Sequence, residues 1–355
     1  MNGIKLKCKK ILTLIVSAVI PLIILTGCWG KTETEDRKYV VTMGIDSDDE
    51  YTNLSDKYDI IGTKGDFIVS MGAARIKSDI GKESEQANMS VFRGENTAEI
   101  RETANNYSNN DIYFGQLKTV VIGKDIIKDN ETFKNMISDI ERTEKINKKV
   151  IAVVAENDAA QIIQKIMEDG EGNGMYIWNY YKNKDVKFDL GEYMDFEHLV
   201  KSMRNKEAII VPQVSIKNQN IVLEGGSVIN KDGYCGDVTK EVLDGLKWIE
   251  GDAKGEIVSA DGISIRVLSQ NVKSKMNDGI FTVKTSVDCV VENGQITDKS
   301  LNELKSVIND KIENTINKAI ELNADIFKIS DDGNITGLNY DISVDIKITS
   351  TGVIK

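Results

Sequence analysis

The residue with the clearest chemistry in this 355-residue chain is Cys28, which follows Leu25, Thr26 and Gly27. A leucine and small residues ahead of one cysteine are typical of a bacterial lipobox. The small side chains let a peptidase reach the bond before the cysteine, whose thiol takes a diacylglyceryl group. Each buried methylene contributes about 0.8 kcal/mol, so two or more chains anchor stably. We therefore predict lipidation at Cys28.

The residues ahead of Cys28 have the layout of a secretory signal peptide. Four lysines and no acid lie in the first ten residues, and an apolar run follows over 11–25. That run is short of the roughly 20 residues that cross a bilayer, and Pro21 interrupts it. A lipid-anchored protein on the extracytoplasmic face of a membrane is favoured over a plain signal peptide with an incidental cysteine, or a permanent transmembrane helix.

Other residue types that support catalysis or metal binding are sparse. His198 is the only histidine, so a Ser/His or Cys/His site would need this residue, which lies in a helical pattern. Cys235 and Cys289 lie in strand-like segments; an oxidising compartment would permit a disulfide, and two buried free thiols are the favoured alternative. No Cys-x-x-Cys spacing suggests zinc. We predict no catalytic residue, no metal ligand and no cofactor.

Two acidic clusters are weak candidates for calcium sites. One contains Asp46, Asp48 and Asp49, and the other contains Asp331 and Asp332. Both lack the glycine and the terminal glutamate of a calcium-binding loop. We interpret both clusters as solvated turns.

Composition limits the class of partner. The formal net charge of −11 becomes −15 without the four leader lysines, so the body is not attracted to nucleic acid or to an anionic membrane surface by charge. Apolar residues make up 41% of the chain and only two residues are proline, which indicates a folded protein. The length favours two or more hydrophobic cores.

The front half has the alternating pattern of an α/β protein. The Asn96 side chain, with Glu99 three positions later, is typical of a helix N-cap. An aromatic run over 176–181 either lines a ligand groove or packs two rings into the core, and we favour core packing. Strands are predicted over 39–46, 67–72, 117–122 and 150–156, and helices over 96–107, 157–170 and 195–204.

From Ala208 onward the pattern changes to strands with few helices between them. Ser300 and Glu303 suggest a capping box for a long helix that ends near Asn323, and its apolar stripe predicts packing on a sheet. A closing strand alternates over 342–348, so one face should pack on that helix. A short helix is predicted over 238–249, and alternating, antiparallel strands over 256–276 and 281–291.

The sequence thus predicts a multi-domain α+β protein, with an α/β-like N-terminal part followed by an antiparallel-sheet domain packed against a long helix. The predicted divisions are a signal peptide over 1–27, a tether over 28–38, an N-terminal domain over 39–206 and a C-terminal domain over 207–355.

An ordered set of motifs resembles the Ger(x)C family, the lipoprotein C subunits of spore nutrient germinant receptors. Cys28-Trp29 with Glu33, followed by Gly-Ile-Asp at 44–46, is similar to the family's Cys-Trp-Asp-x-x-Glu…Gly-Ile-Asp opening, and residues 115–127 resemble its "viviGe" strand. Further segments in the family's order are the strand and helix from 150, Val211-Pro212, Leu246–Gly251, Ala324–Phe327 and Ile348–Gly352. Gly30 replaces the family's Asp after Cys-Trp, and the stretch over 48–66 fits poorly; neither departure affects the anchor.

The resemblance implies a subunit on the outer surface of the spore inner membrane, beside integral-membrane A-type and B-type subunits. It implies a role in receptor function without known catalysis. The alternative is an extracytoplasmic solute-binding lipoprotein of a transporter, which should have two α/β lobes; the antiparallel pattern over 255–291 argues against it. A secreted hydrolase is disfavoured by the single histidine and the lack of a nucleophile motif.

Overall fold

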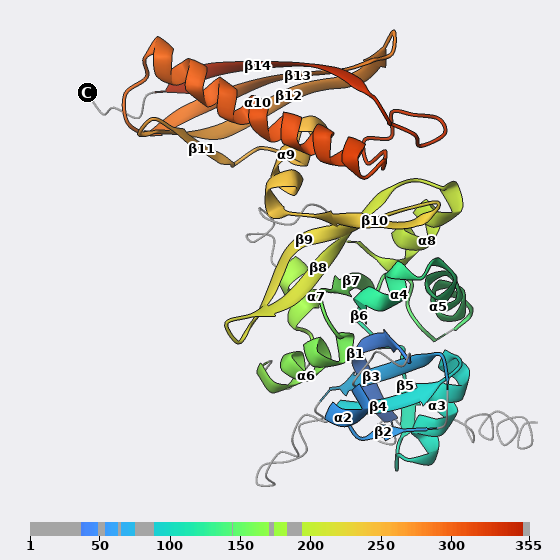
Figure 1. Ribbon diagram of the computed structural model, residues 1–355. Coiled ribbons are helices and arrows are strands. Elements are labelled where there is room, and N and C mark those ends of the chain that lie inside the picture. The colour runs from blue at the N-terminus through green and yellow to red at the C-terminus, as the bar shows by residue number, and fades with distance from the viewer. Residues whose placement is uncertain are drawn as a thin grey trace, which may run out of the picture.

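The computed structural model contains two sheets, one of ten strands and one of four (Figure 1). Cys28, Trp29 and Glu33 lie outside the residues that it describes. No helix among the described residues is long and apolar enough to cross a membrane. The described residues are 37–48, 54–62, 65–74, 89–143, 145–169, 174–182 and 194–350.

The larger sheet has a parallel centre and antiparallel flanks. Strands β1, β6, β7 and β8 run parallel, while β3 and β4 extend the sheet antiparallel on one side, and β9 and β10 do so on the other. β2 pairs with β4, and β5 pairs with β1. The strands are β1 (Arg37–Ser47), β2 (Ile60–Ile61), β3 (Phe67–Ala73), β4 (Met89–Gly94), β5 (Asp111–Tyr113), β6 (Thr119–Ile122), β7 (Ile151–Ala155), β8 (Ile209–Lys217), β9 (Asn220–Asn230) and β10 (Gly233–Val238).

Helices cover both faces of this sheet. This explains why the sequence of its central strands is continuously apolar and does not alternate with polar residues. In β7, Ala152 and Val154 contribute to the core beneath α3, α4, α5 and α8, whereas Ile151 and Val153 contribute to the core beneath α6 and α7. The helices of this part are α2 (Leu54–Lys57), α3 (Thr97–Asn106), α4 (Lys124–Lys128), α5 (Asn130–Arg142), α6 (Ala159–Asp169), α7 (Tyr176–Lys182) and α8 (Phe196–Asn205).

Two local predictions in this part are confirmed. The Asn96 side chain accepts the backbone N–H of Glu99 at 3.0 Å and caps α3. The aromatic run forms α7, in which Tyr181 is buried while Trp178 and Tyr180 are half-buried against the same core. Core packing therefore accounts for these rings.

The smaller sheet has the order β11-β12-β13-β14 and is covered on one face by α10 (Figure 1). β11, β12 and β13 are antiparallel, as predicted. β14 runs parallel to β13, because α10 carries the chain back across the sheet between them. These elements are α9 (Lys240–Glu250), β11 (Ile257–Ala260), β12 (Ile263–Asn277), β13 (Ile280–Asn293), α10 (Asp298–Glu321) and β14 (Asn339–Ser350).

The apolar stripe of α10 faces this sheet, as the sequence predicts. Its buried residues include Leu304, Ile308, Ile312 and Ile316, and Ile346 of β14 belongs to the same core. The mixed α+β, multi-domain class is confirmed.

A separate apolar cluster joins the larger sheet to α9 and α10. Val228 and Val238 of the larger sheet pack with Val242 and Leu243 of α9 and with Ala319 of α10. The backbone hydrogen bonds of the ten-stranded sheet continue through β8, β9 and β10, which follow the predicted division at 206/207. That division stays a prediction.

The start of α10 differs from the predicted one. Thr297 is the N-cap: its hydroxyl oxygen accepts the N–H of Ser300 at 3.1 Å, and the Ser300 hydroxyl accepts the N–H of Thr297 at 2.9 Å. The predicted capping box of Ser300 and Glu303 is therefore wrong. Glu303 instead pairs with Lys299 at 3.4 Å, one turn earlier.

This geometry predicts a larger loss of stability at Thr297 than at Glu303. Thr297→Ala removes an N-cap and should lower the free energy of unfolding by about 1 kcal/mol. Glu303→Ala removes only an exposed pair within the helix and should cost a few tenths of a kcal/mol. Urea denaturation of both variants measures this difference; the reverse ranking would restore Ser300 as the cap.

Candidate functional site

The residues that the sequence offers for catalysis do not form a site in the described structure. His198 lies half-buried in α8, where its backbone N–H donates to the Asp195 carboxylate at 2.7 Å. In the described ranges, no group of three or more His, Cys, Asp or Glu side chains could hold a metal ion. Cys28, the predicted lipid acceptor, lies outside those ranges, so its role stays a prediction.

The two cysteines of the folded body are free thiols. Cys235 is half-buried in β10 and Cys289 is buried in β13. Burial raises the pKa of the Cys289 thiol to about 11 and also raises the pKa of Cys235. Since the thiolate is the reactive form, both thiols are poor nucleophiles near neutral pH.

Asp46 is not part of a solvated turn, and that prediction is wrong. Its side chain is buried at the end of β1, where the two carboxylate oxygens accept the backbone N–H groups of Ala159 and Ala160 at 2.6 and 2.9 Å. These are the first two residues of α6, so Asp46 satisfies two amides that the helix itself leaves unpaired. Asp48 of the same cluster pairs with Arg93 at 2.7 Å, and Asp49 lies outside the residues that the structure describes.

The surroundings of Asp46 leave no room for larger neighbours. A Cβ on Gly123 would lie 2.5 Å from Asp46 Oδ1, and a Cβ on Gly44 would lie 2.8 Å from the Ile163 side chain. Burial raises the pKa of Asp46 to about 7, although the two α6 amides act in the opposite direction. The Gly-Ile-Asp motif thus fastens β1 to α6.

Lys124, directly after Gly123, forms a second polar link. Its ammonium group lies 2.5 Å from both carboxylate oxygens of Asp237 in β10 and 5.2 Å from the centre of the Tyr234 ring. Gln213 and Ser227 also donate to Asp237, at 2.7 and 3.1 Å. The segment that resembles the family's "viviGe" strand therefore reaches the far edge of the ten-stranded sheet.

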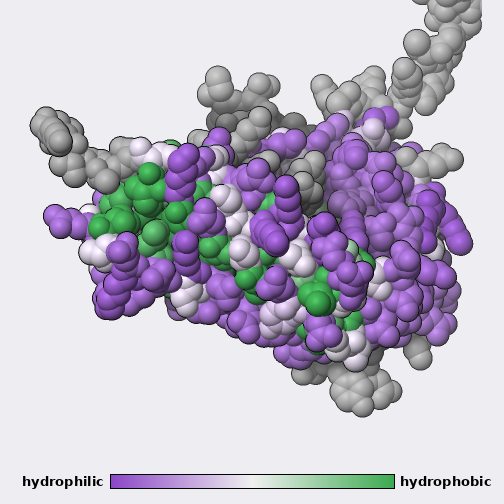
Figure 2. Space-filling view, turned by 90° about the horizontal axis from the view of Figure 1, so that it is seen from above, coloured by the Kyte–Doolittle hydropathy of each residue, from purple (hydrophilic) through white to green (hydrophobic). Residues whose placement is uncertain are grey.

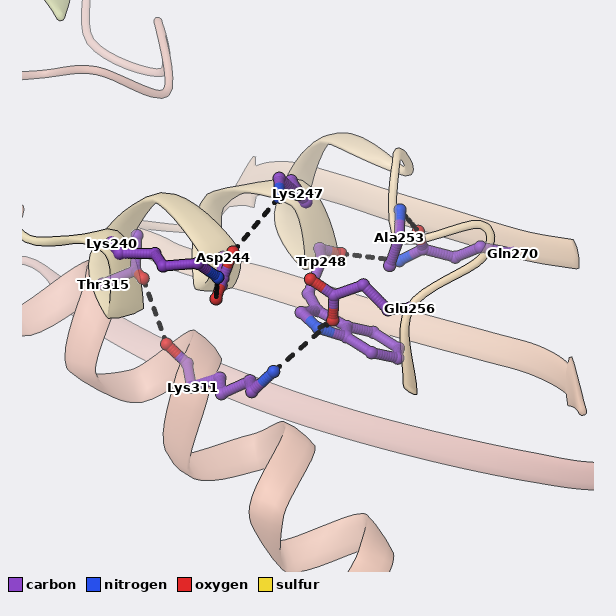
Figure 3. Close-up of polar contacts among 9 residues, drawn as sticks. All are labelled: Lys240, Asp244, Lys247, Trp248, Ala253, Glu256, Gln270, Lys311 and Thr315. Carbon is purple, nitrogen blue, oxygen red and sulfur yellow. Dashed lines mark hydrogen bonds and ion pairs between the residues drawn. The ribbon is translucent and has the colours of Figure 1, made fainter. Parts of the chain in front are cut away.

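The most concentrated set of polar contacts between elements surrounds α9, and we call it the α9 junction (Figure 3). α9 begins two residues after β10 ends and packs against α10, β12 and β9. The junction residues are Lys240, Asp244, Gly245, Lys247, Trp248, Ala253, Glu256, Gln270, Lys311 and Thr315.

The closest approach in the α9 junction is at Gly245. A Cβ on Gly245 would lie 2.1 Å from the Thr315 hydroxyl and 2.2 Å from the Lys311 carbonyl oxygen, so only glycine fits against α10. Thr315 directs its hydroxyl across the contact to the carbonyl oxygen of Val242, at 2.8 Å. The two helices are thus joined backbone against backbone.

Trp248 holds the other face of α9. Its ring is fully buried, and its indole N–H donates to Glu256 at 2.8 Å, while Lys311 of α10 lies 3.4 Å from the same carboxylate oxygen (Figure 3). A buried indole N–H needs such an acceptor, and the nearby lysine offsets the cost of burying the carboxylate.

Gln270 of β12 connects the end of α9 with the smaller sheet. Its amide group donates to the Trp248 carbonyl oxygen at 2.9 Å and to the Thr285 hydroxyl at 3.0 Å, and its carbonyl oxygen accepts the N–H of Ala253 at 2.9 Å. One side chain thereby ties together α9, the turn after it, β12 and β13.

Charged side chains complete the α9 junction. Asp244 lies 2.8 Å from Lys240 and 3.1 Å from Lys247, which is itself buried. These contacts link α9 to α10 and to the smaller sheet.

Comparison with known proteins places these motifs in a family. A profile described as "Spore germination protein N-terminal domain" matches residues 30–216, and one described as "Spore germination B3/ GerAC like, C-terminal" matches residues 224–352. The chain belongs to the Ger(x)C family. The resemblance seen in the sequence is confirmed.

Two curated relatives in Bacillus subtilis (strain 168) agree with the Ger(x)C assignment. The chain is 21% identical to spore germination protein A3 over 273 residues, which cover 75% of this chain and 70% of that protein. It is 22% identical to spore germination protein YndF over 283 residues, which cover 72% and 67% respectively. The crystal structure of the GerBC protein has the same fold, with a TM-score of 0.51, 12% identity and coverage of 80% of this chain and 93% of that one.

Several of the Ger(x)C motifs make polar contacts in the structure. Gly44-Ile-Asp46 provides the cap of α6, and Leu246–Gly251 forms the C-terminal part of α9 and its C-cap. Asp325, in the Ala-Asp-Ile-Phe segment, accepts the N–H groups of Ile329 and Ser330 at 3.1 and 2.7 Å. The sequence offered one signal for the α9 junction, a glycine inside a helical pattern, which often has a packing reason.

Gly245→Ala should lower stability although alanine is the better helix former. The missing room against α10 should cost about 1–3 kcal/mol, which outweighs the gain of about 1 kcal/mol expected in an isolated helix. Glu241→Ala, at an exposed position of α9, is the matched control. Thermal unfolding measures both; a stabilised Gly245→Ala variant would mean that α9 does not contact α10 so closely.

The titration of Asp46 should lower the free energy of unfolding as the pH rises. Since its pKa is raised from 3.8 to about 7, the folded protein holds a proton that the unfolded chain has already released in this range. The contribution is present below about pH 4 and is lost as the pH rises through about 7, by up to about 1.4 kcal/mol per pH unit.

Asp46→Asn removes this titration and serves as the reference. The free energy of unfolding of the wild type should decrease relative to that of the variant from about pH 4 to about pH 7, and the two should run parallel above about pH 8. Urea denaturation at a series of pH values measures the difference. A wild type that gains stability relative to the variant over this range would contradict the raised pKa.

Proposed function

We propose that this chain is the lipid-anchored C subunit of a spore nutrient germinant receptor, and that it acts without catalysis as an assembly and signalling component. The observation that carries the proposal is the pair of germination-family profiles, which together extend over residues 30–216 and 224–352. The proposed partners are integral-membrane A-type and B-type subunits. The proposed location is the outer face of the spore inner membrane.

The described structure supports a mechanical role. Two buried charged side chains, Asp46 and Lys247, make contacts that join elements or brace a helix. The cysteine thiols have raised pKa values, which disfavours nucleophilic catalysis. A body whose two sheets are joined at the α9 junction can transmit a displacement from one sheet to the other.

The anchor gives this role a physical basis. Acyl chains on Cys28 would confine an acidic body, which has no charge attraction to the membrane, to the plane in which its partners lie. Confinement raises the effective concentration of the subunit near its partners without any new contact. The antiparallel β11–β13 arrangement also disfavours the alternative of a two-lobed solute-binding protein.

Cys28→Ala tests the proposal in spores. The variant should be lost from the inner-membrane fraction, and nutrient germination should fall at least about tenfold in rate, because the receptor loses one subunit from the membrane plane. Cys235→Ala, a half-buried thiol away from the predicted lipobox, is the matched control and should behave as the wild type.

Fractionation, immunoblotting and the rate of dipicolinate release measure these outcomes. Normal germination with the Cys28→Ala protein still in the membrane pellet would reject the anchor. Loss of the protein from the membrane with normal nutrient germination would reject the receptor role.

A further inference from the structure

The last strand of the smaller sheet has an open edge. β14 pairs with β13 on one side, and in the described part of the chain no strand pairs with its other side. The strand is twelve residues long and contains no proline. An edge of this length presents a row of backbone N–H and C=O groups that can pair with another strand.

Apolar side chains accompany this edge. On the face of β14 toward α10, Ile346 is buried, while Ile342, Val344 and Ile348 are half-buried in the same core. Figure 2, which looks down on the part of the molecule that contains α10 and β14, shows one larger and several smaller apolar patches among hydrophilic side chains. A further strand at this edge would cover more of these side chains.

The opposite face of β14 carries three exposed charges, Asp341, Asp345 and Lys347. Asp345 pairs with Lys305 of α10 at 3.2 Å. Asp341 and Lys347 form no ion pair with a described residue, and each lies three residues from Val344. The apolar row has the same symmetry, since Ile342 and Ile346 lie two residues on either side of Val344.

We propose that β14 pairs antiparallel with β14 of a second copy of this chain, across a two-fold axis at Val344. Asp341 of each copy then lies opposite Lys347 of the other, and Ile342 lies opposite Ile346. Cross-strand pairs of opposite charge and of apolar side chains both stabilise a sheet. The two four-stranded sheets become one sheet of eight strands, with both α10 helices on the same face.

The charges select this register. Shifting the axis by one residue toward the N-terminus places Asp341 opposite Asp345, and shifting it by one residue toward the C-terminus places Asp345 opposite itself. Like charges directly opposite each other destabilise a pair of strands. The register centred on Val344 avoids both like-charge pairs. In this register Ser343 of one copy lies opposite Asp345 of the other, and its hydroxyl can donate to that carboxylate.

A second copy is the occupant that the pattern favours over an unrelated chain. A two-fold contact requires a surface that is complementary to itself. β14 meets this requirement in both its charged row and its apolar row, whereas pairing with an unrelated strand requires no symmetry about Val344. The acidic charge of the body opposes association, but salt near 0.15 M screens charges farther apart than about 8 Å.

The test uses charge exchange in the full chain, purified in detergent micelles and studied by sedimentation equilibrium at 0.15 M salt. The wild type should form a reversible dimer. Lys347→Asp and Asp341→Lys should each weaken the dimer at least about tenfold, because each creates two like-charge pairs. The double variant Asp341→Lys/Lys347→Asp should return to within about threefold of the wild type.

Two controls isolate the contact between copies. Lys284→Asp changes an exposed charge on β13, away from the open edge, and should leave the dimer unchanged. Lys347 lies opposite Asp288 of β13, so Lys347→Asp also places two acids together within one chain. The double variant keeps that defect, so its recovery can come only from the contact between copies.

A wild type that stays monomeric up to about 100 µM, or a double variant that stays as weak as the single ones, would overturn the proposal. If the isolated chain is monomeric while both the single and double variants lose nutrient germination in spores, the edge binds a different chain. If the wild type forms the dimer, and spores with the dimer-weakening variants keep normal membrane location and normal germination, the dimer is supported and the proposed function does not depend on it.

Discussion

The structure depends on the close packing of α9 against α10. Gly245 lets the two helix backbones approach to a distance at which any side chain would overlap with Thr315 and with the Lys311 carbonyl. Because α9 follows β10 almost directly, this contact also determines where the ten-stranded sheet meets the four-stranded one. The apolar cluster around Val242 and Ala319 fills the space that the contact leaves.

Buried polar groups make this arrangement specific. Asp46, Trp248 and Glu256 would each cost free energy in an apolar interior without partners, and each has partners from a different element. A shift of α9 or α6 would leave these groups unpaired. The polar contacts therefore restrict the packing to one geometry, whereas apolar contacts alone tolerate small displacements.

The predictability of these features follows from the range of the interactions. The cap at Asn96, the stripe of α10 and the alternation in β14 depend on residues a few positions apart, and the sequence predicts them correctly. The role of Asp46 depends on amides more than one hundred residues away, so a local pattern of acids suggested a turn instead. The start of α10 was misplaced because Thr297 and Ser300 both have the chemistry of a cap.

The position of α9 was also beyond a local pattern. A glycine inside a helix indicates close packing but does not identify the partner, which here comes from residues 311–315. The family resemblance, by contrast, depended on the order of motifs along the whole chain, and it was confirmed over both halves. In the structure two of these motifs, Gly44–Asp46 and Leu246–Gly251, make contacts that join separate elements.

Native-state hydrogen exchange tests most directly whether the α9 junction joins the two sheets into one body. Exchange should be compared for α9, for β7 of the larger sheet and for β13 of the smaller one. If the junction is a rigid connection, the α9 amides should open with a free energy at least as large as that of the less stable of the two sheets. Opening of α9 at a clearly lower free energy than both β7 and β13 would contradict this account.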